Sequence, residues 1–329
     1  MDELERRVRA ARPLSGHRDL PLSDRAKREL ADLLLAGTSR KPPRRMKRAR
    51  PHVLVLTVMA IIMAVTVSTV GIASLLISQP AYAATPEMLE LTPIHESVSE
   101  VLDPIADRLE AEPSQPAPTA FTITVQAWTL DIHDNGKSLS SAIVPQDYKI
   151  TVDSDGSRHQ RITSAGPRTS LGAPAPSDSG PTAGHLLSEE AWKPGEYTPL
   201  YPGPAPTDSS KYEAYFNTVV QSDTSLSAAT VLNEVNSLLL EQKLSSHQQG
   251  ALLQYLASLP DLKLAGRVTD RLGRPGVALA ATDPNRREYE SLIVISPADG
   301  RILTTEAIYT GHDRTDIPSP AVVHYYAWK

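Results

Sequence analysis

The chain has 329 residues, with 33 Lys and Arg against 38 Asp and Glu, a formal net charge of −5 and no cysteine. The lack of cysteine excludes disulfides, thiol catalysis, a lipid-modified cysteine and every cysteine-containing zinc site. Residues 1–50 carry 15 basic and 7 acidic residues (net +8), which leaves 18 against 31 (net −13) for residues 51–329. The acidic C-terminal part disfavours binding to phosphate backbones, so we expect no direct nucleic-acid partner.

Residues 1–50 predict a basic cytoplasmic tail with one or two short helices. The better-supported helix has Ser23 as a plausible N-cap and Gly37 as a plausible stop. Two interpretations stay open: a tail without a fixed fold near the membrane, or a segment that orders on a cytosolic partner such as a sigma factor. In the second case the partner-binding anchors are Leu30, Leu33, Leu34 and Leu35.

Residues 51–79 predict a transmembrane helix. No charged residue lies between Val53 and Ile77, and about 25 residues at 1.5 Å each extend roughly 38 Å, enough to cross a hydrocarbon core. Seven basic residues lie between Arg40 and Arg50, whereas none occurs between Ile77 and Arg108. Because basic flanks stay in the cytoplasm, we expect a single-pass plasma-membrane protein with its N-terminus inside and its C-terminal domain outside.

The sequence Ala81-Tyr82-Ala83-Ala84 has the small-x-small form of a signal-peptidase site. A signal peptide has a short basic region and an apolar core of 7–15 residues, whereas about 50 residues precede this longer apolar stretch. A permanent anchor is the favoured interpretation, and cleavage at Ala83-Ala84 stays open as the alternative.

Residues 80–120 predict a juxtamembrane broken helix followed by a Pro-rich hinge. Apolar residues recur at helical spacing from Pro86 to Ala111, with Pro93 and Pro104 as expected interruptions. Glu112–Pro118 forms the hinge.

Residues 121–329 predict an extracytoplasmic α+β domain. Four strands, two of them followed by Asn-Gly or Asp-Gly turns, come first. A loop at 164–210, rich in Pro, Gly and Ser, is expected to be mobile. Two helices and five more strands follow. The expected elements are strands at 121–132, 139–144, 148–153 and 158–163, helices at 227–243 and 246–259, and strands at 262–269, 276–281, 288–295, 301–309 and 321–328. The predicted fold is a curved antiparallel sheet, an open half-barrel, with covering helices.

No catalytic, cofactor-binding or metal-binding motif is present in the sequence. Phosphate-binding loops, dinucleotide fingerprints, nucleophile elbows and H-x-x-x-H pairs are all missing. Asp131, His133 and Asp134 form the best polar cluster, but they precede a tight turn, where polar residues are expected for turn chemistry.

Four aromatic residues are candidates for lining an apolar groove between the sheet and the helices. Core packing and loop attachment are the alternative roles for the same side chains. These residues are Trp128, Trp192, Tyr197 and Tyr201.

The tail beginning Met1-Asp2-Glu3-Leu4, the single span and Ala84-Thr85-Pro86 resemble an actinobacterial group of single-pass membrane proteins of unknown function. The runs 256–271 and 296–303 also look like theirs. Genes of such proteins often neighbour those of extracytoplasmic-function sigma factors, so the resemblance implies envelope signalling. The predicted domain is also similar to the half-barrel of lipoprotein carriers and of sensor proteins that regulate anti-sigma factors. The resemblance brings no catalytic residues, and the cysteine motif of zinc-containing anti-sigma domains is absent.

From these observations we expect a non-enzymatic, membrane-anchored protein without a cofactor and with an anti-sigma-like role. Its outer domain is expected to sense or bind an envelope component, while the tail contacts a cytosolic regulator. One alternative is a tethered carrier or chaperone that shelters a lipid or lipoprotein in an apolar groove. An extracytoplasmic hydrolase is a third possibility, but no group of residues in the sequence matches a hydrolase motif.

Overall fold

The structure is a computed structural model that describes residues 85–134, 139–165, 183–201, 203–314 and 317–329, without the side chains of 131–134 and 139–144. The predicted tail, the predicted span at 51–79 and the site at Ala83-Ala84 lie outside these residues. In the described part of the chain, no helix combines the length and the apolar character needed to cross a membrane.

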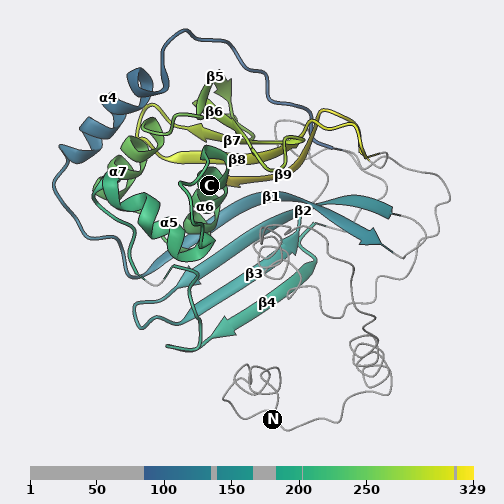
Figure 1. Ribbon diagram of the computed structural model, residues 1–329. Coiled ribbons are helices and arrows are strands. Elements are labelled where there is room, and N and C mark those ends of the chain that lie inside the picture. The colour runs from purple at the N-terminus through teal and green to yellow at the C-terminus, as the bar shows by residue number, and fades with distance from the viewer. Residues whose placement is uncertain (1–84, 135–138, 166–182, 202, 315–316) are drawn as a thin grey trace, which may run out of the picture. The chain divides into compact units, whose positions relative to one another are not determined.

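The nine strands form one antiparallel sheet in the order β4-β3-β2-β1-β9-β8-β7-β6-β5 (Figure 1). Because β4 and β5 are separate edges, the sheet is open, and the predicted α+β class with an antiparallel sheet is confirmed. The strands are β1 (Phe121–Asp134), β2 (Leu139–Val152), β3 (Arg158–Ser164), β4 (Leu186–Trp192), β5 (Lys263–Thr269), β6 (Pro275–Thr282), β7 (Tyr289–Ile295), β8 (Ile302–Tyr309) and β9 (Ala321–Trp328).

Strands β1 and β2 form one long hairpin, paired from Phe121 opposite Val152 to Asp134 opposite Leu139. The sequence predicts two separate strands, 139–144 and 148–153, in the region of β2. This prediction is wrong, because β2 continues through Pro145. Pro145 lies inside β2, where its carbonyl accepts a hydrogen bond from the amide of Ala165. Its missing N–H therefore faces the side of β3, and β3 pairs no further than Gln146, so no sheet hydrogen bond is lost.

Four α-helices and one short 3-10 helix pack beside strands β5–β8, whereas β3 and β4 extend away from them (Figure 1). The main core lies between these helices and one face of β6–β8, where Leu279, Ile293 and Ile295 are fully buried. The helices are α4 (Val98–Glu110), η1 (Ser209–Lys211), α5 (Tyr212–Val220), α6 (Ala228–Glu241) and α7 (Ser246–Ala257).

The two predicted helices match α6 and α7, and their capping residues explain where they begin. The side chain of Ser227 accepts a hydrogen bond from the amide of Thr230 at the start of α6. Ser245 and Gln248 form a capping box at the start of α7. Helix α5 is absent from the sequence prediction, because its nine residues are too few to show a clear apolar period.

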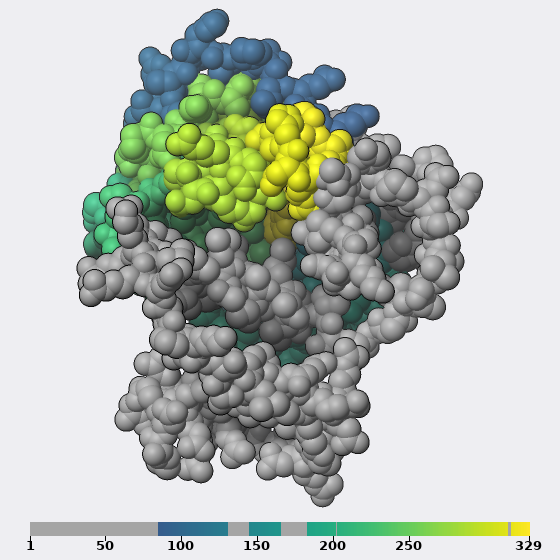
Figure 2. Space-filling view, turned by 45° about the vertical axis from the view of Figure 1, so that its right-hand side comes forward, coloured from purple at the N-terminus to yellow at the C-terminus, as the bar shows by residue number. Residues whose placement is uncertain are grey.

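The expected broken helix over 86–111 is helical only in its second half. Ser97 and Glu100 form the capping box that begins α4. Pro104 lies inside α4 without ending it. The preceding segment is extended, and Thr92 forms a β-bridge with Arg267 of β5. In Figure 2 the blue surface of this N-terminal part lies against the green surface of the later strands.

The expected loop at 164–210 contains regular structure near its end. Leu186–Trp192 form β4, which pairs with β3. Residues 193–205, without residue 202, then cross to helix α6, and we call this segment the strap. The segments before and after β4 in the sequence are rich in Pro and Gly, which are typical of loops. The short strand between them was therefore not predicted.

Candidate functional site

The candidate site is a groove where the C-terminal end of α6 meets the beginning of β1, and we call it the α6 groove. It consists of two hollows of about 310 Å³ and about 170 Å³ that share Gln242 and Lys243 as a dividing wall. The larger hollow falls at the lower end of the size range of ligand pockets. Its apolar wall consists of Ala117, Pro118, Phe121, Val152, Tyr197, Pro199 and Pro204.

The strap forms one wall of the larger hollow and is held by the carboxylate of Glu241, the last residue of α6. Glu241 accepts hydrogen bonds from the Tyr197 hydroxyl at 2.7 Å and from the amides of Leu200 at 2.8 Å and Tyr201 at 3.2 Å. Three donors satisfy this carboxylate. The carboxylate is therefore directed to the strap.

A second carboxylate of α6, that of Glu234, holds the strap seven residues, or about two turns, earlier in the helix. The Tyr201 hydroxyl donates to Glu234 Oε2 at 2.5 Å, and both residues are buried. Burial raises the pKa of Glu234 above its usual range, while the bond from Tyr201 opposes this shift. Burial, with the nearby Glu234 carboxylate, also raises the pKa of Tyr201. The strap is thus attached to α6 at two positions.

Arg158, the first residue of β3, reaches under the strap and lines the larger hollow. Its guanidinium lies over the Tyr197 ring at 4.3 Å from the centroid, and its NH2 group donates to the carbonyl of Leu240 at 3.0 Å. The residue is only 6% exposed, and its buried Nε has no hydrogen-bond partner among the described residues. It forms no ion pair in that part of the chain.

The pKa of Tyr197 reflects both charges beside the hollow. Burial raises it most, the Glu241 carboxylate raises it further, and the Arg158 guanidinium lowers it. Both charged groups therefore act on the same phenol, although Arg158 and Glu241 form no direct ion pair in the described structure.

The smaller hollow has a basic rim. Arg274, Arg301 and Lys329 line it, and Lys243 lies between the two hollows. Each of the first three has an acidic partner: Asp270, Asp299 and Asp147, respectively. Lys243 is exposed and has no ion pair in the described residues.

The four predicted groove aromatics do not converge on one groove. Tyr197 lines the larger hollow, whereas Tyr201 is 1% exposed and packs in the main core beside Tyr215 and Phe216. Trp192 packs edge-on against Tyr197.

Trp128 belongs to a different core from the other three aromatics. It stacks on Tyr325 with ring centroids 5.9 Å apart, in a cluster with Ala278, Leu292 and Val294. These β6 and β7 residues alternate with the ones that face the helices, so Trp128 lies on the opposite face of the sheet. The alternative role in core packing therefore describes Trp128 and Tyr201.

The space between the helices and the sheet, where a carrier needs a cavity, is occupied by side chains. Leu238, Leu252, Leu253, Leu279 and Ile293 are all at 0% exposure there. This close packing does not favour the lipid-carrier alternative.

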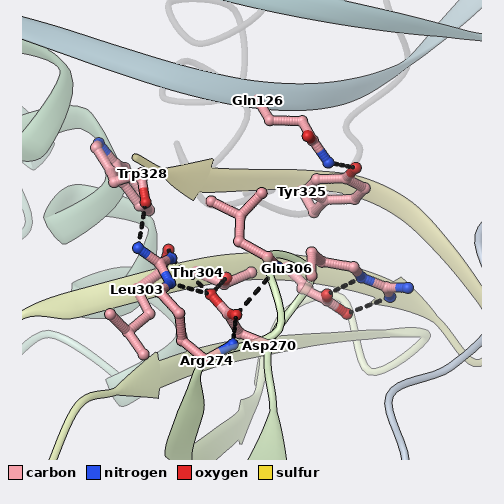
Figure 3. Close-up of polar contacts among 10 residues, drawn as sticks. Gln126, Asp270, Arg274, Leu303, Thr304, Glu306, Tyr325 and Trp328 are labelled. Carbon is pink, nitrogen blue, oxygen red and sulfur yellow. Dashed lines mark hydrogen bonds and ion pairs between the residues drawn. The ribbon is translucent and has the colours of Figure 1, made fainter. Parts of the chain in front are cut away.

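A second polar cluster lies on the far face of the sheet (Figure 3). Asp270 is fully buried and accepts from Arg274 and from the Thr304 hydroxyl. Arg274 also donates to the carbonyls of Trp328 at 2.6 Å and Leu303 at 3.0 Å. The Asp270 and Arg274 side chains pair with each other, so this cluster fixes the β5–β6 turn against β8 and β9, and Arg274 also lines the smaller hollow.

Beside it, the buried guanidinium of Arg271 pairs with Glu306 at 2.7 Å and donates to the carbonyl of Glu87 at 2.8 Å. This contact attaches the segment before α4 to the sheet.

In the described residues, no group of three or more His, Asp or Glu is arranged to hold a metal ion. The side chains of Asp131, His133 and Asp134 lie outside the described part, as do the tail anchors Leu30, Leu33, Leu34 and Leu35. Their predicted roles stay predictions.

Sequence reasoning missed Arg158, Glu234 and Glu241. Arg158 follows an Asp-Gly turn and has the appearance of an ordinary surface residue of a hairpin. The two glutamates are seven residues apart, so they share one face of α6, but the strap that covers this face is not visible in the sequence.

No protein-family model matches the chain, and no curated protein matches it. Among solved structures, it is similar to a chain in the crystal structure of MucB in complex with MucA(peri), with 14% identity, a TM-score of 0.24 and coverage of 70% of this chain and 52% of that chain. It is likewise similar to a chain of the Pseudomonas aeruginosa MucA/MucB complex, with the same identity and TM-score and coverage of 70% and 55%. The chain thus spans about half the length of these structures. At this TM-score the likeness supports no argument about function.

Proposed function

We propose that the protein is a membrane-anchored extracytoplasmic binding protein whose α+β domain holds a segment of a partner protein in the α6 groove. The single observation that carries the proposal is the wall of the larger hollow, where prolines and aromatic rings surround a buried guanidinium that has no ion-pair partner among the described residues. Apolar rings with a few fixed polar groups are typical of recognition sites.

The composition of the groove favours binding over catalysis. The carboxylate in the hollow is satisfied by the strap, so it is not available as a general base. A hydrolase needs convergent titratable groups around a polar cleft, whereas the charged residues that line the larger hollow are Arg158, Lys243 and the strap-bound Glu241.

A photocrosslinking amino acid at Lys243 tests this proposal in cells that produce the full chain. Lys243 is exposed and lies between the two hollows, so we expect a discrete adduct with one protein. Lys211 is a matched control, because it is an exposed lysine (70%) outside the groove. Equal, diffuse adducts from both positions, or none from Lys243, would contradict the proposal.

Membrane anchoring and signalling extend the same proposal. The apolar stretch 53–77 and its basic flank support a single-pass anchor. The apolar stripe of Leu30, Leu33 and Leu34 supports a tail that binds a cytosolic regulator such as a sigma factor. A pull-down with the tail, compared with a tail carrying Leu30→Asp and Leu34→Asp, tests this part. Failure of the wild-type tail to recover a partner would exclude anti-sigma-like signalling without affecting the groove.

A further inference from the structure

We infer that Arg158 is an anion-binding residue in the α6 groove and that it recognises a carboxylate of an acidic partner segment. This inference deepens the proposed binding function and rests on it for the identity of the occupant. Neither the sequence motifs nor the comparisons assign such a site.

The first step of the argument is the imbalance of charge at Arg158. Buried arginines in proteins are normally paired with a carboxylate. Here the residue is 6% exposed, yet its contacts in the described residues are one carbonyl, that of Leu240, and the face of the Tyr197 ring. The helix end and the ring offset part of the charge, but neither supplies a full negative charge.

The second step concerns donors. A guanidinium has five N–H groups arranged to bind a carboxylate through two parallel bonds. Only the bond from NH2 to the carbonyl of Leu240 is formed within the described structure, and Nε is buried without a partner. Buried donors without partners are rare in proteins. The Arg158 Nε–H group, which has none among the described residues, therefore indicates that an acceptor is missing.

The third step is access. Arg158 lines the hollow of about 310 Å³ together with Tyr197, Pro199 and Lys243. Because Arg158 lines the hollow, we expect an acidic side chain that enters it to reach the guanidinium, while the neighbouring residues of the same segment contact the proline and tyrosine walls. The exposed Lys243 at the rim adds attraction for an acidic segment.

The fourth step favours a carboxylate over a phosphate. A single guanidinium balances one negative charge, and the Glu241 carboxylate already lies near enough to act on the pKa of Tyr197. A phosphate carries nearly two charges at neutral pH, so Glu241 would repel it more strongly than it repels a carboxylate with one charge. A carboxylate matches the single charge of the buried guanidinium.

Acetate is the simplest probe, because it needs no knowledge of the partner. The full chain in detergent micelles, with 15N-labelled arginine, is titrated with sodium acetate against sodium chloride of equal ionic strength. We expect the Arg158 Nε–H resonance to shift saturably with acetate and not with chloride. Resonances of Arg161, an exposed arginine of the same strand that pairs with Glu189, are expected to stay in place.

Two capped peptides that differ at one position, acetyl-Pro-Leu-Glu-Pro-amide and its Gln counterpart, then test the occupant. With the Gly156 amide of the groove wall as the reporter, we expect at least tenfold tighter binding of the Glu peptide. Arg158→Gln is expected to abolish this preference and Arg161→Gln to preserve it. Arg158→Lys keeps the charge but loses the planar guanidinium, and it is expected to weaken binding of the Glu peptide about tenfold. It keeps the test valid if the neutral Arg158→Gln variant does not fold.

The outcomes separate this inference from the proposed function. No acetate shift at Arg158, or an equal shift at Arg161, would overturn the anion site even if the Lys243 adduct forms. Tighter binding of inorganic phosphate or of phosphatidylglycerol nanodiscs than of the Glu peptide would overturn the carboxylate assignment. A saturable acetate shift without a Lys243 adduct would support the site and contradict the protein partner.

Discussion

At the scale of single residues, the domain contains two kinds of buried charge. Arg271 and Glu306 have side chains that are each 1% exposed, and they satisfy one another through two nitrogen–oxygen contacts. Arg158 is also buried, but no carboxylate pairs with it in the part of the chain that the structure describes. The Arg271–Glu306 pair shows how a buried charge is kept without destabilising the fold. The Arg158 guanidinium, in contrast, is left able to bind an anionic ligand.

Glu306→Gln is predicted to destabilise the domain strongly, because it removes the carboxylate that pairs with the buried Arg271 guanidinium. We expect a loss of about 3 kcal/mol in the free energy of unfolding, measured by urea denaturation with tryptophan fluorescence. Glu288→Gln is the matched control, since its pair with Arg286 is 3.9 Å apart and exposed, and it should cost below about 1 kcal/mol. Equal losses in the two variants would show that the buried pair has no special role.

His324 is predicted to make stability depend on pH. Burial lowers its pKa from 6.5 to about 4, so the folded state prefers the neutral ring. The unfolded chain takes up the proton first as the pH falls, and the stability from His324 is therefore present above pH 6.5 and lost between 6.5 and 4. Because the side chain of His324 is only partly buried, the loss stays below the roughly 3 kcal/mol to which this pKa difference corresponds.

His324→Gln is expected to flatten the fall in unfolding free energy over this pH window, measured by urea denaturation at several pH values. His185→Gln replaces an exposed histidine and is expected to keep the wild-type slope. An unchanged slope in His324→Gln would contradict the prediction.

At the scale of elements, one edge of the sheet is covered by a segment that comes early in the chain. The edge strand β5 is covered near its middle by the segment before α4, with bonds of 2.8 Å between Thr92 and Arg267 in both directions. Arg271 and the carbonyl of Glu87 attach the same segment a few residues earlier. A covered edge is protected from pairing with other chains, and here the covering segment is the one that follows the predicted span.

Gly266→Ala is predicted to release this segment from β5. Gly266 has φ +144°, and a Cβ there would lie 2.5 Å from the carbonyl oxygen of Thr92, so both bridge bonds must break or shift. We expect faster hydrogen exchange at the Thr92 and Arg267 amides and a stability loss of about 1–3 kcal/mol. Gly203→Ala, with open space around the added atom, is the control. Protection of the two amides at the wild-type level would contradict the prediction.

At the scale of the whole molecule, a short basic part and a longer acidic part lie on either side of the predicted span. This asymmetry predicts the orientation, because basic flanks are retained in the cytoplasm. The chain has no natural cysteine, so single introduced cysteines report on each side without background.

Ser15→Cys in the tail and Asp223→Cys in the domain are predicted to react differently with a membrane-impermeant maleimide. We expect Asp223→Cys to be labelled in spheroplasts, and Ser15→Cys only after the membrane is permeabilised. Recovery of the labelled Asp223→Cys protein in the soluble fraction would indicate cleavage near Ala83-Ala84 instead of a permanent anchor. Labelling of Ser15→Cys in sealed spheroplasts would refute the orientation.

The sequence by itself determined the parts of the fold that depend on local pattern. Alternation and turn pairs predicted most strands, and Ser227 and Ser245 marked the starts of α6 and α7, because capping and side-chain period act over a few residues. Pro145, Pro104 and the loop at 164–210 were misjudged, since tertiary pairing decides whether a proline or a short strand is tolerated. Arg158 comes together with Tyr197 and Glu241 only when the strap crosses α6. Their separation along the chain hides this contact from any local pattern, so the tertiary structure alone decided where the groove lies and which charge is left unpaired.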